Sequence, residues 1–227
     1  MNIRSINNVY NQNINFVGKK PPIQPAVNST NVVNKAKKPR VPITIQNFHK
    51  IDSNVWRGAK PTEAEVAELH ANGVKRIISF CTNYNPQTRQ VGKMPEEANW
   101  AKKLGMDFYW MPFKSNENPP EKYIKDFFKI IDDANKKGEK VFIHCRHGKD
   151  RTGLFSALYR LRNRQCSLSD AIRQLMKYGH DANNNPNIIP FLVDFEEKLN
   201  YKLPKGDFKR SFATLVDNTL KTFRRIK

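Results

Sequence analysis

The stretch HCRHGKDRTG, at residues 144–153, contains residue types suited to chemistry rather than to packing alone. A cysteine, three Lys or Arg side chains, a threonine and two glycines follow directly after the apolar run 141–143. A strand that enters a glycine-containing loop and then a helix gathers loop amides and the positive end of the helix dipole around one point. The stretch therefore predicts an anion-binding site that contains a cysteine.

The spacing of Cys145 and Arg151 indicates what such a site could do. Five residues separate the two, so the loop can curl until the guanidinium faces the sulfur and grips two oxygens of a tetrahedral anion. Gly148 allows the sharp turn, and Gly153 allows close packing of the following helix. The same amides and cations favour the thiolate form of Cys145. A thiolate opposite a bound phosphate predicts attack on phosphorus, a phosphocysteine intermediate and its hydrolysis.

The pattern His-Cys-x5-Arg-Thr-Gly, beginning at His144, resembles the signature of cysteine-dependent protein tyrosine and dual-specificity phosphatases. The stretch FHKIDSNVWRGAKPTEAEVAELHANGVKRIISF is similar to the opening of the atypical dual-specificity branch of plants, fungi and bacteria, and the resemblance extends over roughly residues 46–200. It implies Cys145 as the nucleophile and Arg151 as the phosphate clamp. It also implies that His144 tunes and orients the thiolate, that Thr152 donates to the leaving sulfur, and that neither a metal nor a cofactor takes part.

Each of these residues also has a structural interpretation. A cysteine after a strand can be a small buried hydrophobe, as Cys145 would then be. His144 could be a core histidine at the end of the strand, and Thr152 could cap the following helix.

The remaining loop residues bear on the substrate. We expect the phosphate-binding set to comprise Arg146, His147, Gly148, Lys149, Asp150 and Arg151. Arg146 and Lys149 make the loop similar to that of the phosphatase and tensin homologue family and of atypical enzymes that act on inositol pyrophosphates. Their extra charge suits a substrate with several phosphates, although both side chains could point to solvent. His147 makes the loop resemble the RNA 5′-triphosphatase domain of animal capping enzymes, but there only the loop matches.

The sequence departs from the family where the leaving group receives its proton. Most of these phosphatases place an Asp on the loop after the strand that precedes the long helix, but this loop reads KSNENPP. Glu117 is the best carboxylate in it, unless it is a solvated loop residue. Asp150 is the other candidate, whereas Asp107 lies before the strand. A weak acid is tolerated best with good leaving groups, so we expect aryl phosphates and phosphoanhydrides ahead of alkyl phosphates.

Cys81 ends the stretch VKRIISFC, beside the expected position of Cys145. Its placement corresponds to that of a cysteine that forms a protective disulfide with the nucleophile in the phosphatase and tensin homologue family. The resemblance therefore implies reversible oxidation of Cys145 through Cys81, and the alternative is an inert buried cysteine.

Strand and helix signals alternate from Phe48 onward. Thr62 and Glu65 predict a capping box at the first helix. The pattern predicts strands at 55–56, 74–81, 108–113 and 140–145, and helices at 62–69, 95–105, 120–138, 153–164, 168–178 and 186–200. The order favours an α/β fold, with a central, mostly parallel sheet flanked by helices and a helical C-terminal part.

Composition suggests three regions. We expect a disordered, basic, Asn/Pro-rich tail at 1–42, a phosphatase domain at 43–200 and a basic amphipathic helix at 201–227. The net charge is +19, and most of the excess lies near the two ends. This favours polyanionic partners, namely a phosphorylated protein or inositol phosphate substrate, an anionic membrane surface or nucleic acid, and the alternative is solubility with disordered tails. Nucleic acid is less favoured because only the loop resembles the RNA 5′-triphosphatases. For the C-terminal face, packing on its own domain is the favoured interpretation, and binding to an anionic membrane surface is the alternative.

The apolar runs are too short for a signal peptide or a membrane span, and the three cysteines have no metal-binding or disulfide spacing. We therefore expect a cytoplasmic monomer.

The predicted function is hydrolysis of phosphate monoesters, of the phosphotyrosine and dual-specificity kind. The alternatives are an inositol (pyro)phosphate or phosphoinositide phosphatase, an RNA 5′-triphosphatase, a module that binds phosphorylated ligands without turnover, and a rhodanese-like sulfurtransferase.

Overall fold

The computed structural model describes residues 41–82, 84–85 and 90–200. The predicted tail at 1–42, apart from its last two residues, and the predicted helix at 201–227 lie outside this part of the chain. No helix within the described ranges is long and apolar enough to cross a membrane.

A five-stranded sheet forms the centre of the described residues, in the order β1-β2-β7-β3-β6. All neighbouring pairs are parallel except β1 and β2, which confirms the mostly parallel sheet. A two-stranded antiparallel sheet, β4-β5, lies apart from it. The strands are β1 (His49–Lys50), β2 (Val55–Ala59), β3 (Val74–Ser79), β4 (Tyr84–Asn85), β5 (Gln90–Val91), β6 (Asp107–Trp110) and β7 (Lys140–Cys145).

The six helices of the described chain match the six predicted ones. They are α1 (Glu63–Ala71), α2 (Glu97–Lys103), α3 (Glu121–Lys137), α4 (Asp150–Arg162), α5 (Leu168–Lys177) and α6 (Ile188–Asn200). Three boundaries were wrong by three residues each. α4 begins at Asp150 rather than at Gly153, and β2 extends to Ala59 rather than ending at Trp56. β6 ends at Trp110 rather than at Phe113, since Pro112 has no amide to continue the ladder.

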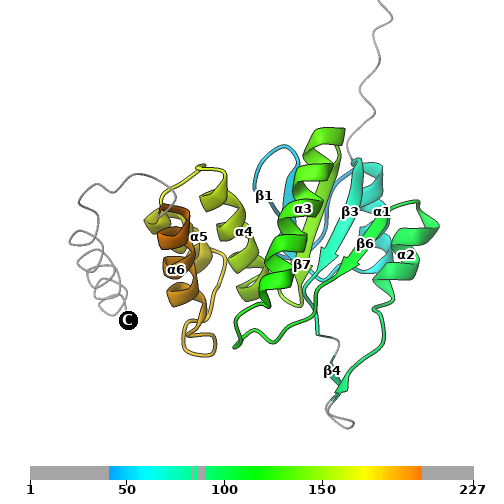
Figure 1. Ribbon diagram of the computed structural model, residues 1–227. Coiled ribbons are helices and arrows are strands. Elements are labelled where there is room, and N and C mark those ends of the chain that lie inside the picture. The colour runs from blue at the N-terminus through cyan, green and yellow to red at the C-terminus, as the bar shows by residue number, and fades with distance from the viewer. Residues whose placement is uncertain (1–40, 83, 86–89, 201–227) are drawn as a thin grey trace, which may run out of the picture. The chain divides into compact units, whose positions relative to one another are not determined.

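The helices cover the two faces of the sheet in two groups (Figure 1). Buried residues of α3, α4, α5 and α6 form one apolar cluster with one face, and buried residues of α1 and α2 form a second cluster with the other. Successive strand residues point to opposite faces. Residues 141, 143 and 145 of β7 accordingly belong to the first cluster, and Phe142 belongs to the second.

Single residues determine where α1 begins, where α3 ends and how closely α4 approaches α5. The predicted capping box of Thr62 and Glu65 is present at α1, and Gly138 ends α3 in the left-handed conformation. A Cβ on Gly153 would lie 2.4 Å from Leu175 Cδ1, so the absence of a side chain there lets α4 approach α5 as predicted.

Candidate active site

Cys145 is the last residue of β7, the middle strand of the five-stranded sheet. Its side chain is 3% exposed and belongs to the apolar cluster that includes α4. α4 begins at Asp150, so the positive end of its dipole is directed at the connecting residues 146–149, the cysteine loop. The strand, loop and helix that the sequence predicts around Cys145 are confirmed.

Three consecutive carbonyl groups of the cysteine loop accept hydrogen bonds from outside it. The Lys60 amide donates to the Arg146 carbonyl over 3.3 Å. Asn47 Nδ2 donates to the carbonyls of His147 over 3.3 Å and Gly148 over 3.0 Å. Because the C=O and N–H groups of one trans peptide unit point in opposite directions, the amides that follow these carbonyls point to the other side of the loop. That side can bind an anion through several N–H groups.

Gly148 gives the cysteine loop its shape. Its φ is +66°, in the left-handed region that favours glycine. A Cβ at this position would lie 2.5 Å from the backbone carbon of Gly58 in β2. The loop therefore lies against β2 so closely that only glycine fits, which supports the predicted role of Gly148 in the turn.

Arg151 is held by the segments that follow two neighbouring strands. Its Nη1 donates to the Phe80 carbonyl over 2.7 Å and to the Phe113 carbonyl over 3.0 Å. Its Nε is buried and has no hydrogen-bond partner. A buried N–H without a partner costs free energy, so the guanidinium is oriented with donor capacity left for an anion.

His144 lies on the opposite face of the sheet from Cys145, stacked on Phe142 with ring centroids 5.8 Å apart. The imidazole is fully buried, and burial lowers the pKa of His144 to about 3, so the ring is neutral at physiological pH. Its Nδ1 lies 4.0 Å from Cys81 Sγ. These contacts fit a core histidine, and any effect of this ring on the Cys145 thiolate would have to act through the intervening backbone.

Thr152 lies in the first turn of α4 and does not cap it. The N-cap position is Lys149, whose side chain makes no capping hydrogen bond. The alternative of a helix cap at Thr152 is therefore wrong, because the helix begins earlier than predicted. The Thr152 hydroxyl is buried and has no hydrogen-bond partner, so it retains a proton to donate to a nearby acceptor.

Asp150 is held by a histidine that sequence reasoning missed. His180 Nδ1 lies 2.6 Å from Asp150 Oδ1, and the Asp181 amide donates to the same oxygen over 3.0 Å. Burial raises the pKa of Asp150, but these two hydrogen bonds outweigh it and leave the pKa below its ordinary value. Asp150 is thus ionised at neutral pH and poorly suited to give up a proton.

Glu117 lies in the exposed loop between β6 and α3, where Lys114 Nζ is 2.9 Å from its Oε1. The loop is fixed at Phe113, whose carbonyl accepts from Arg151, and at Asn118, whose Oδ1 accepts from Asn187 Nδ2 over 3.2 Å. Glu117 therefore lies on a loop that is joined to Arg151, whereas Asp107 pairs with Arg76 at the opposite end of β6.

Arg146, His147 and Lys149 are all exposed. A Cβ on Gly179 would lie 3.1 Å from Lys149 Cε, so the Lys149 stem runs along the turn after α5. The three side chains place positive charge or a titratable ring on the outside of the cysteine loop.

Cys81 lies just beyond β3, and both it and Cys145 are free thiols. Burial raises the pKa of Cys81 to about 11. Its carbonyl accepts from Trp110 Nε1 over 2.7 Å. Cys81 is thus a buried, protonated thiol two residues beyond β3, the strand next to that of Cys145.

Two further residues, Arg57 and Asn47, hold the cysteine loop from behind, and both contact Tyr178; all three were missed. Arg57 Nη2 donates to the Gly148 carbonyl, and the Arg57 guanidinium lies 4.6 Å above the Tyr178 ring. Asn47 joins the Gly148 carbonyl to that of Tyr178, which it reaches over 3.2 Å. The only sequence signal was the charge of Arg57 within the otherwise apolar strand VWRGA.

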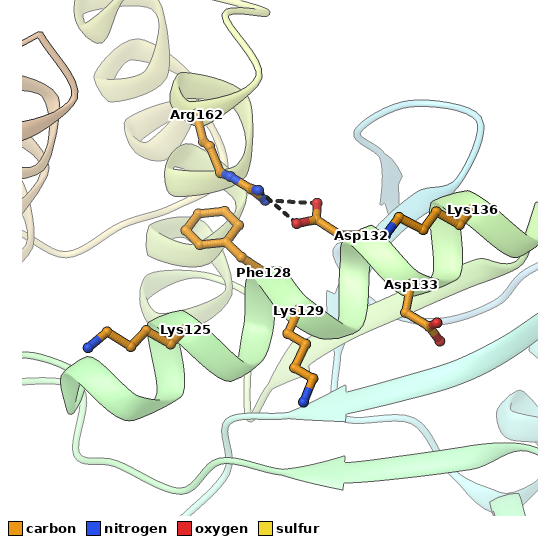
Figure 2. Close-up of a pocket in the computed structure, with 7 residues that line it drawn as sticks. All are labelled: Lys125, Phe128, Lys129, Asp132, Asp133, Lys136 and Arg162. Carbon is orange, nitrogen blue, oxygen red and sulfur yellow. Dashed lines mark hydrogen bonds and ion pairs between the residues drawn. The ribbon is translucent and has the colours of Figure 1, made fainter. Parts of the chain in front are cut away.

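A surface pocket on the outer side of α3 contains none of the candidate catalytic residues (Figure 2). Asp132 accepts two hydrogen bonds from Arg162, whose guanidinium lies 4.4 Å above the Phe128 ring. Asp133 pairs with Arg76 and Lys137. Both carboxylates that line the pocket, Asp132 and Asp133, thus form ion pairs with arginines of other elements.

Within the described ranges, no cluster of His, Cys, Asp and Glu could hold a metal ion.

Comparisons with known proteins agree with this geometry. The model of the dual specificity phosphatase catalytic domain matches residues 55–198. The dual specificity protein phosphatase TpbA of Pseudomonas aeruginosa is 23% identical over 133 residues, which cover 59% of this chain and 55% of that protein. The inositol diphosphatase DSP4 of Arabidopsis thaliana is 24% identical over 124 residues, covering 53% of this chain and 58% of that protein.

Among solved structures, the core catalytic domain of the PP-IP phosphatase SIW14 from S. cerevisiae aligns with a TM-score of 0.51 at 21% identity. The alignment covers 70% of this chain and 93% of that one, and such a likeness concerns the fold. The chain spans about half the length of the curated relatives it matches. On the match of the catalytic-domain model, the chain belongs to the dual-specificity phosphatase family.

Proposed function

We propose that the chain is a cysteine-dependent phosphatase that hydrolyses phosphate monoesters, of the phosphotyrosine and dual-specificity kind, through a phosphocysteine intermediate. One observation carries the proposal: a buried thiol at the end of β7 leads through a glycine turn into the N-terminus of α4, beside an Arg151 guanidinium with an unpartnered N–H. Membership of the dual-specificity phosphatase family supports it.

The geometry supports a two-step reaction. The loop amides and Arg151 bind the phosphate oxygens, and the Cys145 sulfur attacks phosphorus as the ester oxygen leaves with a proton. Water then attacks the phosphocysteine, and sulfur leaves as the thiolate. The unpartnered Thr152 hydroxyl can donate to that sulfur as its charge returns.

Glu117 is the better candidate for the group that protonates the leaving oxygen. It belongs to the loop that Arg151 holds at Phe113, and an exposed carboxyl can move toward a bound substrate. Asp150 instead keeps its carboxylate on His180 and on the Asp181 amide, which supports a role in positioning the loop.

Turnover of p-nitrophenyl phosphate by the full chain tests the proposal, with Cys145→Ser as the control, because this leaving group hardly needs an acid. We expect turnover by the wild-type chain and none above background by the variant. Equal rates would contradict the proposal. A chain that binds a phosphopeptide without turning over any substrate would be a binding module, and turnover of thiosulfate would indicate a sulfurtransferase.

An inositol (pyro)phosphate or phosphoinositide is the second candidate substrate. Arg146, His147 and Lys149 are exposed on the cysteine loop, and extra positive charge suits several phosphates. Two similar proteins are described as an inositol diphosphatase and a PP-IP phosphatase. A panel of phosphopeptides, inositol phosphates, phosphoinositides and 5′-triphosphorylated RNA, each with the Cys145→Ser control, separates these classes. Replacement of both Arg146 and Lys149 by Ala should then lower turnover of a polyphosphate by about tenfold more than that of p-nitrophenyl phosphate.

Reversible oxidation is a further part of the proposal. Peroxide would convert the Cys145 thiolate to a sulfenic acid and be reduced to water, and the Cys81 sulfur would then displace water to form a disulfide. Cys81 follows β3, the strand next to β7, which supports this. Its Sγ faces the His144 ring, however, and its raised pKa slows the second step, so the Cys81 side chain has to turn toward Cys145 for the disulfide to form. Mass spectrometry of peroxide-treated protein should find a peptide crosslinked through Cys81 and Cys145, and its absence would contradict the idea.

We also propose a cytoplasmic monomer whose residues 201–227 bind an anionic membrane surface. Size-exclusion chromatography tests whether the chain is a monomer, and cell fractionation tests its location. Sedimentation with phosphatidylserine vesicles, comparing the full chain with one that ends at residue 200, tests the membrane binding.

A further inference from the structure

Arg57 is a buried cation in the middle of β2, and all five residues of this strand are buried. Its side chain is 2% exposed. In the sheet register Arg57 pairs with Ile143, and Ala59 pairs with Cys145. Because residues two apart on a strand project to the same face, the side chains of Arg57 and Cys145 lie on the same side of the sheet, the side that α4 covers.

Every partner that the structure gives the Arg57 guanidinium is neutral. Nη2 donates to the Gly148 carbonyl, and Nη1 donates to Ser156 Oγ of α4 over 3.4 Å. The face of the guanidinium lies 4.6 Å above the Tyr178 ring at the end of α5. Nε is buried without a hydrogen-bond partner.

The other buried arginine of the sheet shows what is missing here. Arg76 of β3 is 4% exposed, and its Nη2 lies 2.6 Å from both Asp133 and Glu139. No carboxylate among the described residues lies within ion-pair distance of Arg57. A buried charge without a counterion is costly, so an anion that faces Arg57 would be strongly favoured.

The titratable groups on the elements next to the guanidinium identify that anion. They are Cys145, two residues beyond the Arg57 partner on β7, Tyr178 at the end of α5, and His49, which pairs with Arg57 in the register of β1 and β2. Burial lowers the pKa of Arg57 to about 10, which leaves the guanidinium charged at pH 7. Burial, followed by the charges of Arg57 and Lys177, lowers the pKa of His49, which leaves that ring neutral.

We propose that Arg57 is the buried counterion of the Cys145 thiolate and a positioning residue that holds the cysteine loop through the Gly148 carbonyl. The inference rests on the proposed phosphatase activity for its purpose, but not for its test. Arg151 offers its donors to a substrate from the front, whereas Arg57 acts from behind, under the turn of the loop, and does not touch the substrate. Its charge is present in the free protein, so the thiolate is stabilised before any phosphate binds.

Two substitutions separate the charge from the hydrogen bond. Arg57→Gln keeps an N–H donor for the Gly148 carbonyl and removes the charge, and Arg57→Lys keeps the charge. Arg162→Gln is the matched control, since Arg162 also lies above an aromatic ring and pairs with Asp132 on the outer side of α3. The readout is the rate at which iodoacetamide alkylates Cys145 between pH 4 and 9, measured on its peptide by mass spectrometry.

We expect the midpoint of the alkylation profile to rise by about one pH unit in Arg57→Gln, which is about a tenfold loss of reactive thiolate at low pH. Arg57→Lys and Arg162→Gln should stay within a few tenths of a unit of the wild type. The acidic limb of kcat/KM for p-nitrophenyl phosphate should move with the alkylation midpoint. A midpoint in Arg57→Gln equal to that of the wild type, or equal shifts in the Gln and Lys variants, would overturn the role of the charge.

A second measurement needs no variant of Arg57. If Cys145 is ionised in the folded protein and protonated in the unfolded chain, the unfolded chain binds more protons, so stability rises with pH. The wild type should therefore gain stability relative to Cys145→Ser between pH 5 and 8 in urea unfolding, and parallel stabilities would overturn the counterion role. Both experiments read Cys145 directly. If the wild type turns over p-nitrophenyl phosphate but the alkylation midpoint of Arg57→Gln is unshifted, this inference alone is refuted. If the midpoint of Arg57→Gln is shifted but the wild type has no turnover, the proposed function alone is refuted.

Discussion

Two buried cysteines, Cys145 and Cys81, lie at the ends of the neighbouring strands β7 and β3 in opposite surroundings. Cys81 faces the neutral imidazole of His144, and burial raises its pKa to about 11. Cys145 instead continues into a loop with outward-facing carbonyls, the N-terminus of α4 and two arginines. The difference teaches that burial by itself suppresses a thiolate, and that a nucleophile depends on the anion-binding groups built around it.

Of the substitutions around Cys145, Arg151→Lys should cause the largest loss of turnover. An ammonium cannot hold two carbonyls and an anion in one plane, so we expect turnover of p-nitrophenyl phosphate to fall about 10³-fold, mainly in kcat. Arg162→Lys, which weakens the two-point pair with Asp132, is the control and should stay within about twofold of the wild type. Similar losses in the two variants would mean that Arg151 is only structural.

Gly148→Ala tests the close approach that shapes the loop after Cys145. The left-handed φ and the 2.5 Å contact with Gly58 together predict a loss of about 3 kcal/mol in the free energy of unfolding, with loss of activity. Gly138→Ala is the matched control, because Gly138 has nearly the same φ, +65°, and nothing within 4 Å of its added Cβ. It should cost about 1 kcal/mol. Urea unfolding distinguishes the two, and equal costs would contradict the account of the crowded turn.

Glu117→Gln tests whether a carboxyl on the loop between β6 and α3 protonates the leaving oxygen when Cys145 attacks phosphorus. Turnover of phenyl phosphate should fall about 10²-fold, and that of p-nitrophenyl phosphate should change less than about fivefold, because a good leaving group needs little protonation. Glu121→Gln, an exposed carboxyl at the start of α3, is the control. The same leaving-group dependence in Asp150→Asn but not in Glu117→Gln would assign the acid to Asp150.

His144→Gln probes the neutral surroundings of Cys81 and should have the smallest effect on activity of these four variants at pH 7. The folded-state pKa of His144, about 3, lies below its ordinary value of 6.5, so only the unfolded chain takes up this proton between these values. The contribution is therefore intact above pH 6.5 and is lost as the pH falls toward 3, by about 1 kcal/mol per pH unit. Urea unfolding at pH 7, 5.5 and 4.5 should show a shallower loss in the variant than in the wild type or in His70→Gln. Parallel profiles would show that the pKa of His144 is not lowered in the folded protein.

The residues around Cys145 that were predictable are neighbours in sequence. The apolar run of β7, the left-handed Gly148 and the start of α4 follow one another within a dozen positions, and each has a local physical signal. The order of strands and helices was likewise readable from hydrophobic periodicity, and the parallel sheet followed from their alternation. The two-residue strands β1, β4 and β5 were missed because so short a segment has no period.

The residues behind the cysteine loop, Asn47, Arg57 and Tyr178, could not be predicted because their contacts join positions far apart in the sequence. Asn47 and Tyr178, which are joined through one amide, are 131 positions apart, and Arg57 reaches Gly148 across 91 positions. A single charge in a short strand commonly faces solvent, so the charge of Arg57 in an apolar strand was too weak a signal to predict that its side chain is buried. His180 stands after a glycine turn with no nearby acidic residue except Asp181, and only the fold brings it to Asp150.

Competitive alkylation of the three cysteines tests the central claim most directly. The full chain is treated with limiting iodoacetate at pH 6.5, with and without orthovanadate, and the modified peptides of Cys145, Cys81 and Cys166 are quantified by mass spectrometry. The account predicts that Cys145 reacts fastest although it is only 3% exposed, and that vanadate, which occupies the anion site, protects it alone. Alkylation of Cys145 no faster than that of Cys166, or without protection by vanadate, would contradict the account.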